Sequence, residues 1–533
     1  MTELRNSQRV SVQTSLSALC DWAETNAGSG GVHSEAANFV LELHDHRDGD
    51  GDRDGDRDAR LVCVDVLRWL PQKRLVFSAL LDDIKVVVKL FFGAGCERYA
   101  LRERAGSEAI AQAGVATPNC LADWQLSFQD SRSTARSCAL VFEYIDAQSL
   151  TTDSLERGVV EWTELARVLA RLNAKGFTHQ DFHLGNLLYQ GSNPSRLWLV
   201  DGDGVRKSRH ATTQRHAVAQ FSRLCAQAQA NLPAKTSATA WRAYCEQRGW
   251  SANQISSTIE RSLRAARRRR VVHFQAKTRR NCSAVLRCRM GAAALLVNRD
   301  WLRETSDNME SSDFLDWLHG LPEEFEDYPV IKAGNTATLV TAAWKGRRLV
   351  IKRYNNKSLW HRARRLIRSD RGLNSWVFGH TLTFVGIPTA TPVALRQAPL
   401  AGPTYLVMAA LEGVELTPQA CDDNEALFAQ CAELLEALRM EGLVHGDLKA
   451  SNFLLTDLFD TNGGNTPTDP GALQRLEAVR AAKNIALLDL DSMRMPRMPR
   501  SRYAGEIKDK RRFLRNFAAA PSAQRRFRSI LGL

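Results

Sequence analysis

The chain has 533 residues, an ordinary apolar fraction of 44% and a formal net charge of +13 at pH 7. No apolar run approaches the length of about eighteen residues that spans a bilayer, and the 11 scattered cysteines include no Cys-x-x-Cys pair. Composition therefore argues against a membrane-spanning protein, a disulfide framework and a zinc site of that type, and it favours a cytoplasmic protein.

Residues 1–60 form a variable N-terminal segment that ends in an Asp-rich, low-complexity linker at residues 48–58. Three runs rich in β-branched and aromatic residues follow, LVCVDVLRWL, KRLVFSALL and IKVVVKLFF, and they predict an antiparallel sheet. Lys89 lies near the end of the third run, where a kinase N-lobe places the lysine that binds the α and β phosphates. No glycine occurs between residues 61 and 92, so a Gly-x-Gly-x-x-Gly loop is absent and any phosphate clamp must use other backbone geometry.

The next segment, residues 95–114, has a helical pattern. A helix here would supply the carboxylate partner of Lys89, and of the candidates Glu97, Glu103 and Glu108 we choose Glu103. Residues 138–145, CALVFEYI, are then expected to form the strand and hinge on which an adenine rests.

The segment FTHQDFHLGNLLYQGSNPSRLWLVDGDGVR, residues 177–206, has the form His-x-Asp-x-x-x-x-Asn followed by an apolar run that ends in Asp201. An Asp at the start of a short loop can accept the proton of an attacking hydroxyl, here Asp181, and an Asn five residues later, here Asn186, can bind a metal ion. Asp201 would supply the anionic metal ligand. This set of groups fits ATP and Mg²⁺.

The same pattern recurs later in the chain. Residues 443–455 read LVHGDLKASNFLL and residues 485–494 read IALLDLDSMR, so that the loop residues His179, Asp181 and Asn186 are repeated 266 positions later as His445, Asp447 and Asn452, and the metal Asp is repeated as Asp489. Lys89 lies 92 residues before Asp181, and Lys352, in RRLVIKRYN, lies 95 residues before Asp447. The repeat predicts two copies of one site.

The second copy departs from the first in its helix. Residues 371–386, RGLNSWVFGHTLTFVG, contain no acidic residue, and Asp370 just before them is the candidate substitute. Without a helix carboxylate Lys352 would be less well oriented, which puts the competence of the second site in doubt.

We therefore predict an α+β protein with two tandem protein-kinase-like domains, each with a small β-rich N-lobe and a helical C-lobe. The first domain is placed at residues 61–302, an acidic linker at residues 303–328, and the second domain, with a basic C-terminal tail, at residues 329–533.

Several stretches resemble the bacterial lipopolysaccharide core sugar kinases, the Kdo and heptose kinase family. They are VLRWLPQKRLVF, VVVKLFF, GVATP, THQDFHLGNLLY and VDGDGVR in the first unit, and LVIKRYN, GIPTATP, VHGDLKASNFLL, LDLDS and DKRRFLRNF in the second. The resemblance covers roughly residues 60–530. It implies a protein-kinase-like fold, ATP with Mg²⁺, and a sugar hydroxyl of the lipid A core as acceptor.

Transferred onto this chain, the resemblance implies the following roles. The catalytic bases are Asp181 and Asp447, the metal ligands are Asn186, Asp201, Asn452 and Asp489, and the phosphate-binding lysines are Lys89 and Lys352, with Lys449 beside the γ phosphate. His179 and His445 are interpreted as structural residues that hold the loop, and Asp203 and Asp491 as turn residues.

Basic residues cluster at 264–280, at 357–371 and in the tail from residue 494, which has twelve basic and two acidic residues. Such clusters attract phosphate-rich partners such as anionic lipid, although a solvated, Arg-rich helix face is the simpler interpretation. We expect a peripheral enzyme on the cytoplasmic face of the inner membrane, with lipopolysaccharide core-lipid A as its partner.

Three alternatives remain open at this stage. One is a small-molecule or protein kinase, and the lack of an Ala-Pro-Glu segment weakens the protein-kinase version. Another is a protein with one active kinase unit and one regulatory pseudokinase unit. A specific nucleic-acid binder ranks low because no aromatic stacking motif accompanies the arginines. The sequence names neither the acceptor sugar nor the oligomeric state.

Overall fold

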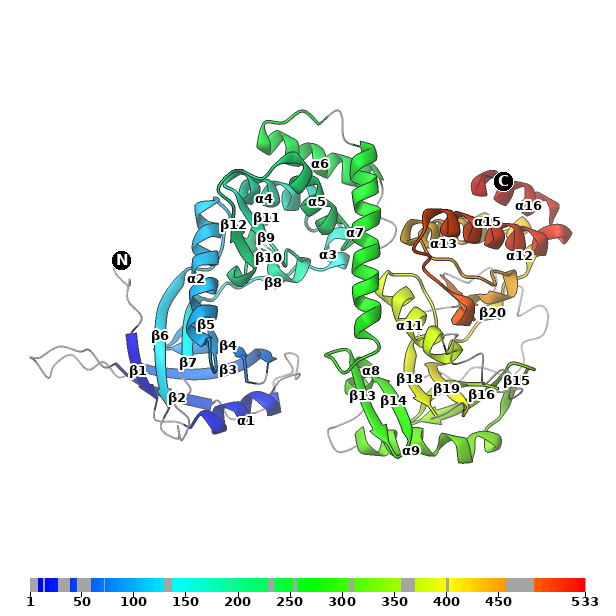
Figure 1. Cartoon of the computed structure of the whole chain (residues 1–533), viewed down its shortest axis with the longest axis horizontal. Helices are drawn as coiled ribbons and strands as arrows, with labels where there is room; N and C mark the ends of the chain where they lie inside the picture. Colours follow the sequence, from blue (N-terminus) through cyan, green and yellow to red (C-terminus); the bar gives the residue numbers. More distant parts are fainter. Residues whose placement is uncertain are drawn as a thin grey trace, which may run out of the picture. The chain divides into compact units, whose positions relative to one another are not determined.

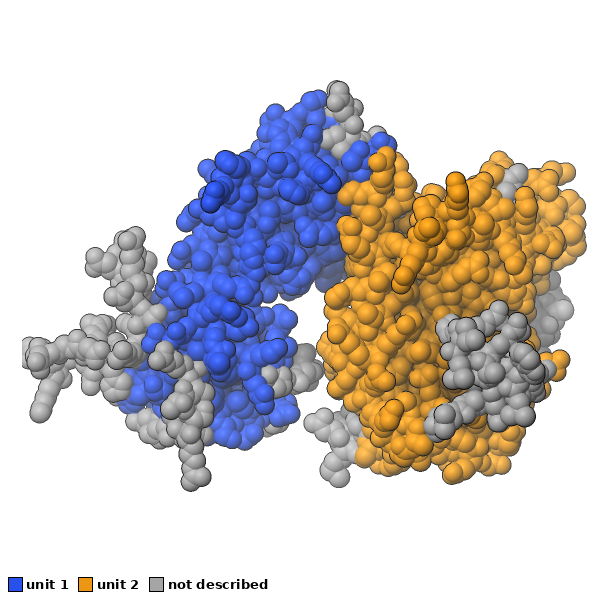
Figure 2. Space-filling model, viewed as in Figure 1, with its two compact units in different colours: residues 1–227, 233–259 blue, residues 228–232, 260–533 orange. Residues whose placement is uncertain are grey.

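The computed structural model describes residues 8–12, 15–26, 39–45, 59–70, 72–128, 137–191, 193–228, 234–252, 256–305, 311–355, 370–398, 402–456 and 484–532. Within these residues the chain is a mixed α+β protein (Figure 1). It divides into two compact units, which are coloured separately in Figure 2. Unit 1 comprises residues 1–227 and 233–259, and unit 2 comprises residues 228–232 and 260–533.

Unit 1 contains a closed barrel with the strand order β1-β2-β3-β4-β5-β7-β6. The strands are β1 (Gln8–Val12), β2 (Phe39–Asp45), β3 (Ala59–Leu70), β4 (Arg74–Leu81), β5 (Ile84–Phe91), β6 (Cys120–Phe128) and β7 (Ser137–Glu143). Neighbouring strands are antiparallel except β1 and β6, whose parallel pairing closes the barrel. Because side chains alternate along a strand, Val86 and Val88 of β5 lie in the barrel core and Lys89 lies on the opposite face.

The remainder of unit 1 is mostly helical. Helix α1 (Leu16–Asn26) adds Leu19 and Ala23 to the barrel core, and α2 (Cys96–Gln112) packs Cys96 and Ala100 against β7. The other helices are α3 (Thr152–Glu156), α4 (Trp162–Ala174), α5 (Gln214–Cys225) and α6 (Ala234–Arg248). Short strands and 3₁₀ helices connect them: β8 (Gln148–Ser149), β9 (Phe177–His179), η1 (Leu184–Asn186), β10 (Leu187–Gln190), β11 (Asn193–Leu199), η2 (Gly202–Gly204) and β12 (Val205–Lys207).

Unit 2 is built on an antiparallel sheet with the order β13-β14-β18-β19-β17-β16-β15. The strands are β13 (Val285–Met290), β14 (Ala293–Asn298), β15 (Val330–Ala333), β16 (Ala337–Trp344), β17 (Arg347–Tyr354), β18 (Pro392–Gln397) and β19 (Thr404–Ala409). Helices α8 (Arg299–Thr305) and α9 (Ser311–Glu324), with η3 (Phe325–Asp327), share one core with the sheet, and α11 (Arg371–Phe384) shares another.

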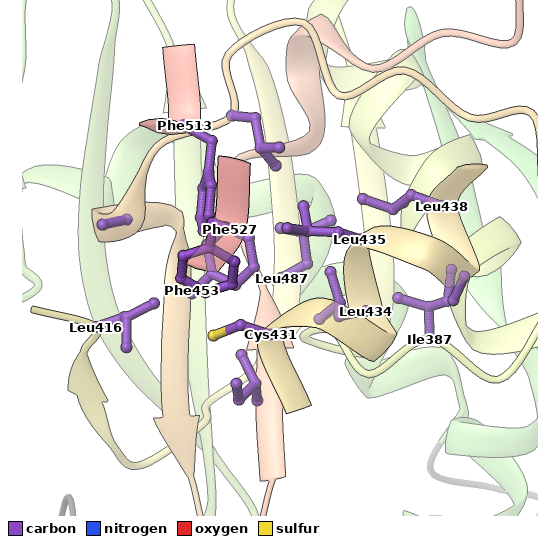
Figure 3. Close-up of a cluster of buried hydrophobic side chains, with 14 of the residues drawn as sticks. Ile387, Leu416, Cys431, Leu434, Leu435, Leu438, Phe453, Leu487, Phe513 and Phe527 are labelled. Carbon is purple, nitrogen blue, oxygen red and sulfur yellow. The ribbon is translucent and has the colours of Figure 1, made fainter. Parts of the chain in front are cut away.

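The C-terminal part of unit 2 has a core of its own. It is formed by α7 (Ser256–Lys277), which begins in unit 1, and by β20 (Val414–Glu415), α12 (Pro418–Asp423), α13 (Glu425–Glu441), η4 (Ala450–Asn452), β21 (Phe453–Thr456), β22 (Asn484–Leu487), η5 (Leu490–Ser492), α15 (Pro499–Asn516), η6 (Phe517–Ala519) and α16 (Pro521–Leu531). Figure 3 shows Phe453, Phe513 and Phe527 gathered near Cys431 of α13. Aromatic rings from β21, α15 and α16 therefore join these elements into one core.

The two units repeat one topology. In unit 1 the order β4-β5-β7-β6 has α2 inserted between β5 and β6, and in unit 2 the order β16-β17-β19-β18 has α11 inserted between β17 and β18. The small sheet β8-β10-β11 likewise corresponds to β20-β21-β22. The repeat seen in the motifs is therefore a repeat of strand arrangement as well.

The observed division differs from the predicted domain boundaries. Of the segment predicted as an acidic linker, residues 303–305 end α8 and residues 311–327 form α9 and η3, and Phe314, Leu318 and Leu321 are buried against the sheet. The acidic residues Asp313 and Asp316 lie on the exposed side of α9, so a count of charges hid an amphipathic helix. Strands β13 and β14, placed by sequence in the first domain, pair within the sheet of unit 2.

The N-terminal segment also differs from the prediction. Its described residues form β1, α1 and β2, and these elements belong to the barrel of unit 1. The parallel pairing of β1 with β6 joins segments more than a hundred residues apart, which local patterns do not reveal. The Asp-rich run at residues 48–58 lies outside the described residues.

Candidate active site

The predicted loop residues of unit 1 meet at one end of the β10–β11 ladder. The backbone N of Val200 donates to the backbone O of Asn186 at 2.9 Å, which places Asn186 and Asp201 at the same end of the two strands. Asn186 Nδ2 donates to the backbone O of Asp181 at 3.0 Å. The structure therefore brings Asp181, Asn186 and Asp201 together, although they are spread over twenty residues of sequence.

Asp181 presents its carboxylate to solvent. Its side chain is 71% exposed, and His183 Nε2 lies 3.6 Å from Oδ2. A carboxylate in this position is accessible to a hydroxyl group of a substrate.

His179 holds the backbone of Asp201. Its ring is 2% exposed, and Nε2 lies 2.9 Å from the backbone O of Asp201. Because a carbonyl only accepts, Nε2 carries the hydrogen. Burial lowers the pKa of His179, so the ring is neutral. A Cβ at Gly204 would lie 2.6 Å from His179 Cε1, so a glycine is needed where the ring packs on the backbone.

Glu103 joins the lysine strand to the segment after Asp201. Its fully buried carboxylate contacts Lys89 Nζ and accepts hydrogen bonds from the backbone N of Gly202 and of Asp203, each at 3.0 Å. Lys89 Nζ also lies 3.9 Å from Asp201 Oδ1. The predicted residues Lys89, Glu103 and Asp201 thus form one cluster.

Two glycines permit this arrangement. A Cβ at Gly106 of α2 would lie 1.9 Å from the backbone O of Gly202, and a Cβ at Gly202 would lie 2.4 Å from the backbone O of Glu103. Only residues without side chains allow α2 to approach η2 this closely. Sequence analysis did not identify Gly106. The signal that could have identified it is its position three residues after Glu103, which places both residues on the same face of α2.

Arg74 is a second site residue that sequence analysis missed. Its Nη1 lies 3.4 Å from Asp201 Oδ1, and the two side chains are 13% and 19% exposed. Burial raises the pKa of the Asp201 carboxyl, but Lys89 and Arg74 lower it more, so that the pKa is below its usual value. The pairing of β4 with β5 could have identified Arg74, since Arg74 opposes Phe91, which is two residues after Lys89.

Unit 2 repeats the loop geometry. Asn452 Nδ2 donates to the backbone O of Asp447 at 2.8 Å, and the backbone N of Leu488 donates to the backbone O of Asn452 at 2.8 Å. His445 Nε2 donates to Leu488 O at 3.0 Å, and burial lowers its pKa. Asp489 has a φ of 59°, close to the 67° of Asp201 in unit 1. Such left-handed conformations are uncommon outside glycine, so their recurrence at matching positions indicates a shared turn.

The lysine of unit 2 has different partners. Lys352 Nζ lies 2.7 Å from Asp489 Oδ1 and 3.8 Å from Asp491 Oδ2. Burial raises the pKa of the Asp489 carboxyl, but Lys352 lowers it more, so that the pKa is below its usual value. In unit 1 the strand lysine pairs with the helix carboxylate Glu103, whereas in unit 2 it pairs with Asp489, a predicted metal ligand.

Helix α11 explains this difference. Helix α2 ends at the C-cap Ala113, and α11 ends at the C-cap Val385. Ten residues before its C-cap, α2 has Glu103, whereas α11 has Ser375. Ser375 Oγ lies 2.7 Å from the hydroxyl of Tyr354, in the interior.

Asp370, the candidate substitute for the helix carboxylate, instead caps α11. Its Oδ1 accepts from the backbone N of Gly372 at 2.8 Å, and its Oδ2 accepts from Gln397 and Thr404 at 2.9 Å each. Within the described residues, the acidic neighbours of Lys352 are Asp489 and Asp491.

Asp447 is enclosed by cations, unlike Asp181. Its side chain is 32% exposed, with Arg512 Nη1 2.5 Å from Oδ1 and Lys449 Nζ 2.9 Å from Oδ2. Asp509 of α15 also accepts from the backbone N of Gly446 at about 3 Å through both oxygens. Helix α15 therefore holds the loop at residues 445–452 of unit 2 and pairs with one oxygen of the predicted base.

The donor groups of each unit fit Mg²⁺. Asn186 with Asp201, and Asn452 with Asp489, offer the oxygen ligands that this ion prefers. Among the described residues no cluster of three or more His, Cys, Asp or Glu side chains could hold a metal by itself. A magnesium ion at either pair would take its remaining ligands from phosphate and water, as is usual for this ion.

Some arginines of the basic stretches contact other parts of unit 2. Arg267 of α7 forms a buried ion pair with Glu441 at 3.3 Å, Arg270 lies 4.1 Å from the ring centre of Phe384, and Arg512 Nη1 donates to the backbone O of Gly446 at 2.8 Å. Residues 357–369 lie outside the described residues. In the part of the chain that the structure describes, no helix is long and apolar enough to cross a membrane.

No protein-family model and no curated protein matches the chain. Among solved structures, WaaP in complex with acyl carrier protein is similar with a TM-score of 0.30 and 21% identity, over 38% of this chain and 86% of that chain. A structure of vaccinia related kinase 3 is similar with a TM-score of 0.22 and 14% identity, over 35% of this chain and 56% of that chain. These scores are too low to assign a fold or an activity by similarity.

Proposed function

We propose that the protein is an ATP-dependent phosphotransferase with two tandem protein-kinase-like units, and that unit 1 transfers the γ-phosphoryl group of ATP to an alcohol. One observation carries this proposal. In each unit a strand lysine, a loop aspartate, an asparagine bonded back to that aspartate, and an aspartate with positive φ occupy equivalent positions. Phosphotransferases of the kinase type use these four groups to bind phosphates, accept a proton and hold metal.

The surroundings of each residue in unit 1 suit its proposed task. Asp181 is exposed and can accept the proton of an acceptor hydroxyl. Lys89, oriented by Glu103, offers its ammonium to the α and β phosphates. Asn186 and Asp201 would hold Mg²⁺, which neutralises charge on the transferred group when bound. Because the protein supplies little covalent chemistry in phosphoryl transfer, positioning and charge neutralisation account for the rate.

The acceptor we propose is a heptose or Kdo hydroxyl of the lipopolysaccharide inner core. The support is the resemblance of both units to that kinase family. A surface at residues 494–503 of unit 2 is consistent with it, since Arg497 and Arg500 are exposed beside Met498 and Tyr503, each 67% exposed. Basic residues interspersed with apolar ones suit the surface of an anionic bilayer. The enzyme would then be peripheral on the cytoplasmic face of the inner membrane, without specific nucleic-acid binding.

Flotation with liposomes tests the membrane proposal. The parent should float with anionic vesicles and not with neutral ones, and a chain with Met498→Asp and Tyr503→Asp should float less. Equal recovery of the parent with both vesicle types would contradict it.

A specific observation favours a second candidate function, in which unit 2 is a regulatory pseudokinase unit. Arg512 and Lys449 occupy both oxygens of Asp447, and Lys352 binds Asp489 in the absence of a helix carboxylate. A base with both oxygens paired is poorly placed to receive a hydroxyl proton. We therefore assign most of the turnover to unit 1.

The test is phosphate incorporation from ATP into purified core-lipid A by the parent, Asp181→Asn and Asp447→Asn. Removal of a general base costs about a hundredfold or more, so Asp181→Asn should lose nearly all transfer and Asp447→Asn should retain most of it. Asp83→Asn, at an exposed turn with a φ of 63° that Asn tolerates, is the control. Equal losses in both variants would contradict the regulatory assignment. A parent that binds ATP but transfers nothing to core-lipid A would favour a small-molecule or protein kinase.

A further inference from the structure

The hairpin of β3 and β4 in unit 1 has basic residues at its turn and no glycine-rich loop. Residues 61–92 contain no glycine, and the turn after Leu70 is closed by a hydrogen bond from the backbone N of Lys73 to the backbone O of Leu70 at 3.0 Å. Three basic residues, Arg68, Lys73 and Arg74, lie at or beside this turn. The hairpin therefore brings positive charge, not backbone flexibility, to this end of the barrel.

Strand register places two of these cations on the face that carries Lys89. Arg68 of β3 opposes Val76 of β4, and Val76 in turn opposes Lys89 of β5. Arg74 opposes Phe91, two residues after Lys89. Residues directly opposite in an antiparallel pair point to the same face, and residues two apart share a face. Arg68, Arg74 and Lys89 thus share the face away from the barrel core.

Two of these cations converge on Asp201, and Arg68 shares their face. Arg74 Nη1 lies 3.4 Å and Lys89 Nζ 3.9 Å from Asp201 Oδ1. Glu103 and Asp201 supply two negative charges against these three positive ones. With Asp201 committed to a metal ion, Arg74 would lose its partner and the excess of positive charge would rise.

We propose that Arg74 and Arg68 form a side-chain clamp for the β and γ phosphates of a nucleoside triphosphate in unit 1, in place of a glycine-rich backbone loop. The inference rests on the proposed function, since it names how that site holds its nucleotide. Guanidinium groups suit this task because their paired N–H donors match phosphate oxygens.

Unit 2 supplies an internal comparison. Lys332 of β15 opposes Leu339, which opposes Lys352, so a cation stands at the equivalent of Arg68. The position equivalent to Arg74 is Ala337, which opposes Tyr354. Arg74→Ala therefore gives unit 1 the residue that unit 2 already has, in a strand of the same length and pairing.

The test is nucleotide binding by the full chain, measured by calorimetry with ATP, ADP and AMP in a Lys352→Met background that weakens unit 2. Arg74→Ala should weaken ATP binding about tenfold or more, because a hydrogen bond between charged groups is lost. The loss for ADP should be smaller, and AMP should change less than about twofold, since neither phosphate that the clamp contacts is present. Arg74→Lys should recover part of the ATP affinity.

Two comparisons distinguish a clamp from a structural ion pair. Arg60→Ala removes a charge from the other end of β3, beside the turn at Asp82, and should leave ATP binding unchanged. If the effect of Arg74→Ala is equal for ATP and AMP, Arg74 acts through Asp201 or the fold and the clamp is refuted.

The outcomes also separate this inference from the proposed function. If the parent transfers phosphate and Arg74→Ala binds ATP as the parent does, the clamp is wrong and the phosphotransferase proposal stands. If the parent transfers no phosphate to any alcohol but its affinity depends on Arg74 and on phosphate number, the function is wrong and the clamp stands. A unit 1 that binds no nucleotide would overturn both.

Discussion

Gly106→Ala tests whether the contact between α2 and the 3₁₀ helix η2 organises the site of unit 1. The added methyl group would lie 1.9 Å from the backbone O of Gly202 and 2.4 Å from its carbonyl carbon. Both are backbone atoms and cannot rotate away. Helix α2 would have to retreat by about 1.5 Å to reach a van der Waals separation of about 3.5 Å.

A retreat of that size would break the two hydrogen bonds that Glu103 accepts from Gly202 and Asp203, each now 3.0 Å long. Hydrogen bonds to charged groups contribute about 1.5–3 kcal/mol each. We expect the free energy of unfolding of unit 1 to fall by about 3 kcal/mol, the lower end of that range for two bonds. Phosphate transfer should fall by about a hundredfold, because a displacement near 1 Å misaligns Lys89.

Urea denaturation, followed by hydrogen exchange in peptides from residues 96–112, measures the stability of unit 1 separately. Gly191→Ala is the matched control, since a Cβ there meets nothing within 4 Å and the residue lacks a positive φ. The reasoning is refuted if Gly106→Ala unfolds within about 0.5 kcal/mol of this control and transfers phosphate at the rate of the parent.

Glu103→Gln removes the closest anion of Lys89, and we expect urea denaturation to show that the free energy of unfolding of unit 1 falls by about 3–5 kcal/mol. A fall below about 1 kcal/mol would mean that the Lys89–Glu103 ion pair does not stabilise the fold. In a chain that carries Asp181→Asn, Arg512→Ala should raise the residual phosphate transfer by unit 2, because Oδ1 of Asp447 becomes available, and an unchanged rate would show that Arg512 does not restrain it. Burial lowers the pKa of His380 from 6.5 to about 4, so the unfolded chain takes up a proton at higher pH than the folded one. The contribution of His380 to the free energy of unfolding, about 3 kcal/mol, is therefore fully present above pH 6.5 and should be lost as the pH falls toward 4. In urea denaturation of unit 2, His380→Phe should show a smaller fall in the free energy of unfolding between pH 7 and pH 4.5.

Local sequence patterns were sufficient for the parts of the site that lie close together in the chain. The loop from Asp181 to Asn186 is closed by a hydrogen bond within six residues, and the strand that carries Lys89 alternates between apolar and polar side chains. Such features depend on neighbours along the chain, which is why the motifs placed them correctly in the fold. The catalytic and ligand-binding roles of these residues remain predictions.

Patterns along the chain could not reveal contacts between distant segments. Arg74 meets Asp201 across 127 residues, and Lys352 meets Asp489 across 137 residues. The first contact needs the register of β4 against β5, and the second depends on Ser375 standing where α2 has Glu103. The amphipathic helix α9 was hidden for a different reason, since its exposed acidic residues dominated the composition of that segment.

The difference between the two lysines has a consequence for metal binding. In unit 1, Lys89 has a carboxylate of its own in Glu103, and Asp201 is 3.9 Å from the ammonium group. In unit 2, the closest anion of Lys352 is Asp489, at 2.7 Å, and the nearby Asp491 also pairs with Arg371.

A magnesium ion at Asp489 would therefore compete with Lys352, whereas a magnesium ion at Asp201 leaves the Lys89–Glu103 pair intact. Binding of the ion in unit 2 would have to offset the loss of the ion pair between Lys352, whose side chain is 11% exposed, and its closest anion. Unit 2 should thus bind Mg²⁺ more weakly than unit 1 even though its asparagine makes the same hydrogen bond to the loop aspartate. We expect the loss of the helix carboxylate to be enough, by itself, to give the two units different affinities for Mg²⁺.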